Sequence, residues 1–126
     1  MTETDAIVAL AELGSTGGTY IAMHYSFTFA YLTVAYLIGA KLSTFQCIAI
    51  SGLYSVTAFF SGATGVGYAQ AWLNLHNRES TILHTVWIFD NLLWTEGLVF
   101  VMAGGVILSL YFMYNVRHGI AAQIAE

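Results

Sequence analysis

The sequence predicts an all-α integral membrane protein with three transmembrane helices and a short amphipathic helix at its N-terminus. Three observations predict this class. Of 126 residues, 58% are apolar and 8% are charged, against roughly 45–50% and about 25% in soluble domains. Long apolar runs occur three times along the chain. No proline is present to break them. We therefore expect one membrane domain, residues 1–126.

Residues 2–13 show the pattern of a short amphipathic helix. Thr2 or Thr4 is a candidate N-cap, acidic residues follow in the first turn, and apolar side chains share one face. A helix of this kind lies in the interface between lipid and water. The glycine-rich run 14–18 then predicts a flexible joint into the first span.

Three segments are expected to cross the membrane. The first, residues 20–40, has about 21 residues, which at ~1.5 Å each matches a hydrocarbon thickness of ~30 Å. The second is 44–72. The third, 82–116, has about 35 residues and a helical length of roughly 52 Å, too long for a bilayer. We interpret the second and third helices as a long hairpin that extends beyond the bilayer, with a strongly tilted third helix as the alternative.

The three basic residues indicate an orientation. With three spans, Lys41 and Arg117 share one side, and Arg78 shares the other side with four acidic residues. Because cytoplasmic loops are enriched in Lys and Arg, this predicts an outside N-terminus and a cytoplasmic C-terminus in a cell membrane, plasma or inner.

Composition also excludes several functions. A net charge of −4 with three basic residues leaves no patch that could neutralise nucleic-acid phosphates. The single cysteine, Cys47, excludes an intrachain disulfide and a CxxC motif. No catalytic, nucleotide-binding or transport motif is present, so we do not expect an enzyme.

Small residues at four-residue spacing give each span a ridge that another helix can approach. In lipid, helices associate by such close packing and by interhelical hydrogen bonds. The residues expected to pack in this way are Ala22, Ser26 and Ala30 in the first span, Ser51, Ser55, Gly62 and Gly65 in the second, and Gly104 and Gly105 in the third.

Ionisable residues within spans are the first place to look for function. Counting residues from the cytoplasmic boundary puts His24 level with Leu98, within one helical turn of Glu96. We therefore predict a His24–Glu96 pair. It is interpreted as a structural hydrogen bond between helices, with a proton-carrying site and a metal site as alternatives.

Two further sites involve the histidines near the tip of the predicted hairpin. His76 and His84, with Asp90 as a third ligand, are candidates for Zn²⁺ or Cu²⁺, although exposed loop histidines are the simpler interpretation. A b-type haem between His24 and His84 is disfavoured, because the count separates His84 from Leu98 by roughly 20 Å.

The sequence thus favours a small non-catalytic subunit that self-assembles or supports a larger membrane complex. Its expected partners are the lipid bilayer and further copies of the chain or other membrane subunits. A redox subunit carrying metal or haem b is the first alternative, although no cofactor is favoured. A small oligomeric transporter or pore is the second.

Overall fold

The computed structural model describes residues 2–78 and 91–124, and the side-chain environments within 2–78 and 94–119. In these segments the chain is helical and contains no strand. Its elements are α1 (Glu3–Ile38), the 3₁₀ turn η1 (Gly39–Lys41), α2 (Thr44–Arg78) and α4 (Asn91–Ile124).

Three helical stretches are long and apolar enough to cross a membrane. They are Glu3–Lys41, Thr44–Arg78 and Trp94–Gly119. The predicted all-α class and the number of spanning-length helices are therefore confirmed for the part of the chain described.

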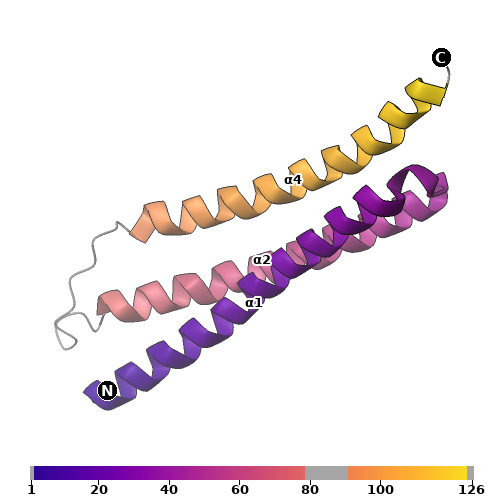
Figure 1. Cartoon of the computed structure of the whole chain (residues 1–126). Helices are drawn as coiled ribbons and strands as arrows, with labels where there is room; N and C mark the ends of the chain where they lie inside the picture. Colours follow the sequence, from indigo (N-terminus) through magenta and orange to yellow (C-terminus); the bar gives the residue numbers. More distant parts are fainter. Residues whose placement is uncertain (1, 79–90, 125–126) are drawn as a thin grey trace.

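α1 and α2 form a closely packed pair, and α4 packs against this pair (Figure 1). α1 and α2 run antiparallel and lie side by side, with the N-terminus of α1 near the C-terminal end of α2, and α4 runs antiparallel to α2. α1 packs more extensively against α2 than against α4, and more than α2 does against α4. The most extensive contact thus joins the first two helices, while the second and third, predicted as a long hairpin, are antiparallel neighbours with a smaller contact.

The N-terminal segment is part of α1. Thr2 is the N-cap: its Oγ1 accepts a hydrogen bond from Asp5 N at 3.2 Å, and Asp5 Oδ2 accepts one from Thr2 N at 3.1 Å. This reciprocal capping box confirms one of the two expected caps. The helix continues without a break through residues 14–18, so the separate helix over 2–13 and the flexible joint are wrong.

Two glycines of that run, Gly14 and Gly17, lie where α1 approaches α2. A Cβ atom at Gly17 would stand 3.0 Å from Tyr68 Cβ, and one at Gly14 would stand 3.4 Å from the Trp72 ring nitrogen. A glycine costs about 1 kcal/mol relative to alanine within a helix. Here the close contact between the helices compensates for that cost. Gly14 and Gly17 therefore let α1 pack against α2, and α1 continues through them without a break.

The interface between α1 and α2 follows a heptad-like repeat. In both helices the facing positions alternate in steps of three and four residues, which is the spacing of about 3.5 residues found in left-handed coiled coils. The positions are Leu10, Gly14, Gly17, Ile21, His24, Thr28, Tyr31 and Ala35 in α1, and Ser51, Tyr54, Ala58, Ser61, Gly65, Tyr68 and Trp72 in α2. We call this the α1–α2 seam.

The helices also end later than expected. α2 reaches Arg78 beyond the predicted 44–72, and α4 reaches Ile124 beyond the predicted end at 116; of the predicted third span, 82–90 lies outside the described residues. α1 has 36 residues and α2 has 35, each about 50 Å long. The expectation that only the second and third helices exceed a bilayer is therefore wrong.

Hydroxyl groups within the helices are satisfied locally. In each case the side-chain oxygen donates to the carbonyl four residues earlier, so a polar residue adds little exposed polarity to an apolar helix. The residues are Thr19, Ser26, Thr28, Thr33, Ser55, Thr57, Ser61 and Ser109.

Neighbouring glycines allow a test of the seam. Gly17→Ala should lower the free energy of unfolding in detergent by about 1–3 kcal/mol, because the new methyl group meets Tyr68. Gly18→Ala should raise it by up to about 1 kcal/mol, because nothing lies within 4 Å of its Cβ position. Circular dichroism during denaturant titration measures both, and equal stability of the two variants would contradict the seam.

Candidate functional site

His24 is the most deeply buried ionisable side chain within the apolar seam. It comes from the middle of α1, is 3% exposed, and its Nδ1 lies 3.0 Å from the carbonyl oxygen of Ala58 in α2. The ring fits because α2 has a glycine beside it: a Cβ atom at Gly62 would stand 3.3 Å from Nδ1.

This hydrogen bond fixes the form of the neutral imidazole. A carbonyl oxygen can only accept, so Nδ1 carries the proton and donates it. Nε2 then has a free lone pair in neutral His24. The contact with Ala58 therefore makes the second ring nitrogen a hydrogen-bond acceptor or a ligand atom.

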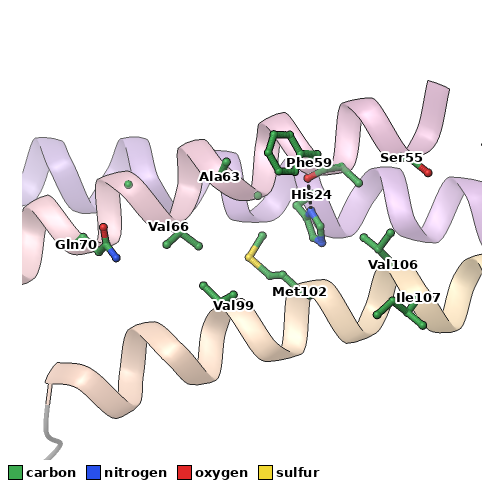
Figure 2. A pocket seen from close by; sticks show the side chains of 14 residues that line it. His24, Ser55, Phe59, Ala63, Val66, Gln70, Val99, Met102, Val106 and Ile107 are labelled. Atoms are coloured by element: carbon green, nitrogen blue, oxygen red, sulfur yellow. Dashed lines mark hydrogen bonds between the residues drawn. The ribbon is translucent and has the colours of Figure 1, made fainter. Parts of the chain in front are cut away.

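An apolar groove of about 630 Å³ opens beside this ring (Figure 2). One wall is α2 from Ser55 to Gln70, and the other is α4 from Val99 to Ile107. Volumes of roughly 300–1,000 Å³ lined mainly by apolar side chains are typical of small-molecule sites. We call this space the His24 groove.

Nε2 of His24 reaches the groove. The hydrogen bond between His24 and the described residues is made by Nδ1. Among those residues, every fully buried side-chain nitrogen or oxygen has a hydrogen-bond partner. Nε2 has no such partner and therefore keeps accessible surface. Figure 2 shows this nitrogen on the side of the ring turned toward α4, near Met102 and Val106.

Toward the C-terminal end of α1 from His24, the seam contains a cluster of aromatic and polar side chains. Tyr31 and Tyr54 stack with ring centroids 4.2 Å apart. The Tyr31 hydroxyl lies 2.8 Å from Ser51 Oγ, and the Tyr54 hydroxyl donates to Thr28 Oγ1 at 3.1 Å. These groups satisfy one another, so the cluster holds the helices together and offers no free polar atom to a ligand.

The structure does not bring His24 and Glu96 together. Glu96 is exposed, and no hydrogen bond or ion pair joins the two side chains within the described residues. On α4, Met102 lines the same groove as His24, and its Cε lies 3.4 Å from a Cβ atom built at Gly62. Met102 follows Glu96 by six residues, a rise of about 9 Å along α4. A count by residue number gives only the depth along each helix and does not say which faces of the helices meet.

The candidate metal site lies only partly within the described chain. His84 and Asp90 are outside it. His76 belongs to the last turn of α2, where it is 6% exposed and stacks on Trp72 at 5.1 Å. It is therefore not an exposed loop histidine. In residues 2–78 and 91–124, no three His, Cys, Asp or Glu side chains converge as metal ligands.

The predicted packing residues separate into two groups. Gly62 and Gly65 are buried in the seam, Ser51 bonds Tyr31, and Ser55 lines the His24 groove. The others have little or no contact with the described helices: Ala22, Ser26 and Ala30 are exposed, and no atom lies within 4 Å of a Cβ built at Gly104 or Gly105.

The partners of His24 were missed by sequence reasoning. Ala58 contributes a main-chain oxygen, which leaves no signal in residue type, and Met102 looks like any other apolar residue of its helix. A usable signal was present, however. His24 stands in the three-and-four spacing from Gly17 to Ala35, which marks it as an inward residue of α1.

Comparison of the chain with protein-family models, curated proteins and solved structures gave no match. The chemistry of its own residues is therefore the basis for a functional proposal.

Replacing His24 tests the hydrogen bond to α2. His24→Phe keeps a ring of similar size but removes the donor to Ala58 O. The free energy of unfolding in detergent should therefore fall by about 1 kcal/mol. His118→Phe is the matched control, because this exposed histidine bonds only within its own helix, to Tyr114 O. If His118→Phe lowered the free energy of unfolding as much as His24→Phe does, the stabilising role of the His24–Ala58 hydrogen bond would be contradicted.

Proposed function

We propose that the chain is a non-catalytic, membrane-spanning subunit that assembles with further copies of itself or with other membrane subunits. The exposure of large apolar side chains on all three helices carries this proposal. Within the 18-residue apolar window of each helix, at most 22% of residues are buried. In water a surface of this kind aggregates or is covered, whereas lipid accepts it. Strongly exposed examples are Phe29, Phe45, Phe60, Phe100 and Leu108.

Assembly is supported by small-residue faces that the single chain leaves open. Ala22, Ser26 and Ala30 lie on the side of α1 opposite the seam and are exposed. Gly97 and Gly104, seven residues apart on α4, have no neighbour within 4 Å of their Cβ positions. Small residues at such spacing allow another helix to approach closely in lipid.

Charges at the two ends of the bundle support the predicted orientation. Lys41 lies in η1 and Arg117 donates to Thr44 Oγ1 at 3.3 Å, so these two cations share one end. Glu3 and Asp5 lie in the first turn of α1, near the C-terminal end of α2. By the positive-inside rule the Lys41 end faces the cytoplasm.

Cysteine labelling tests both insertion and orientation. In a Cys47→Ser background, a membrane-impermeant maleimide should label Thr4→Cys on intact cells. Ser43→Cys, beside Lys41, should react only after permeabilisation. Both positions are exposed and both changes leave the charge pattern intact. The reversed pattern would contradict the orientation, and release of the protein by alkaline carbonate would contradict membrane insertion.

A mass measurement tests assembly. The protein extracted with its native lipid, without detergent, should have a mass that exceeds that of one chain. Ser26→Leu with Gly104→Leu should lower that mass while leaving the helical circular dichroism unchanged, because both side chains point away from the described core. Ala11→Leu, at an exposed position of α1 well before the small-residue face, is the control. A wild-type monomer would contradict the proposal.

A further inference from the structure

We propose that the His24 groove binds an elongated apolar molecule through a single hydroxyl group, which donates a hydrogen bond to Nε2 of His24. The inference does not depend on assembly into a larger complex, because both walls of the groove and the histidine belong to one chain.

The dimensions of the groove favour a chain-like occupant. Ser55 to Gln70 covers sixteen residues of α2, a length of about 22 Å. A volume of about 630 Å³ over that length gives a mean cross-section of about 29 Å². A long groove of this mean cross-section suits a single hydrocarbon chain.

The lining includes the polar side chains of Ser55, Gln70 and His24, of which only His24 is buried and specifies the head group. Gln70 is exposed at the end of the groove away from Ser55 (Figure 2). Ser55 already donates its hydroxyl hydrogen to Ser51 O. His24 is 3% exposed, its Nδ1 is used by Ala58 O, and its Nε2 faces the groove as an acceptor (Figure 2). An acceptor in apolar surroundings is best satisfied by a hydroxyl hydrogen. Around it the space is formed by apolar groups, including Gly62, Met102 and Val106.

The same lining disfavours haem or a metal ion. Nε2 is a suitable iron ligand, but the described residues that line the groove include no Lys or Arg to pair with haem carboxylates. Within the same described lining, His24 is the only His, Cys, Asp or Glu, so it supplies no further strong ligand for a metal ion. A neutral molecule with one donor fits the lining better than a charged one.

Two probes that differ only in methylation of the phenol oxygen test the interaction. Full-length protein labelled with ¹⁵N-histidine, in lipid nanodiscs, is titrated with 4-dodecylphenol or with 4-dodecylanisole, which lacks the hydroxyl hydrogen. The His24 signals are assigned from their loss in His24→Phe. The phenol should shift the Nε2 resonance and bind about tenfold more tightly than the anisole. Equal affinities, or no shift of Nε2, would overturn the proposal.

A pair of glycine variants tests the location. Gly67→Leu places a side chain in the groove without a clash at Cβ, since nothing lies within 4 Å of it. It should weaken phenol binding at least tenfold. Gly52→Leu is the matched control on the same helix: its Cβ position is equally open and it does not line the groove. Loss of binding in the control, or its retention in Gly67→Leu, would overturn the assignment.

A third arm separates the sources of the hydroxyl. 1-Dodecanol carries an aliphatic hydroxyl on a chain of the same length as that of the phenol. Tighter binding of 1-dodecanol supports a membrane alcohol as the natural occupant, and tighter binding of the phenol supports a phenolic lipid. A Soret absorption band in protein purified from haem-supplemented cells would identify Nε2 as a haem ligand and overturn the proposal.

Discussion

The close approach of α1 to α2 is the constraint on which the rest of the structure depends. Along the seam a small residue on one helix faces a large one on the other, as Gly17 faces Tyr68 and Gly65 faces Ile21. Two apolar helices gain little from apolar contact when lipid offers the same contact, so close fit and hydrogen bonds must supply the specificity. The bond from His24 to Ala58 O fixes the relative position of the helices at mid-length.

The His24 groove follows from this asymmetric packing. α1 and α2 pack small residues such as Gly17 and Gly65 against each other, and α4 meets the pair through a few buried side chains, including Met102, Ser109 and Met113. Other small residues of α2, including Ala63 and Gly67, line the groove between α2 and α4. The ring of His24, held between α1 and α2, thus borders the apolar His24 groove between α2 and α4.

Much of the fold was predictable from the sequence, because it depends on composition and length. Three apolar runs without proline determine three spanning-length helices, and the Thr2–Asp5 spacing indicates the cap that is found. The run 14–18 was misinterpreted because its glycines have low helix propensity, while the tertiary contact that keeps them helical is not visible locally. The His24–Glu96 pair failed for a related reason. Depth counted along the sequence contains no information on how helices incline or which faces meet, and the actual partner of His24 is a backbone oxygen.

The unbroken length of α1 bears on the proposed membrane insertion. Its 36 residues extend about 54 Å, and even at a tilt of 40° they would project about 41 Å along a membrane normal, more than the ~30 Å of hydrocarbon. In the proposed arrangement, the ends of the α1–α2 pair would therefore stand in the headgroup region or beyond it, and a thicker bilayer would cover more of the apolar surface there.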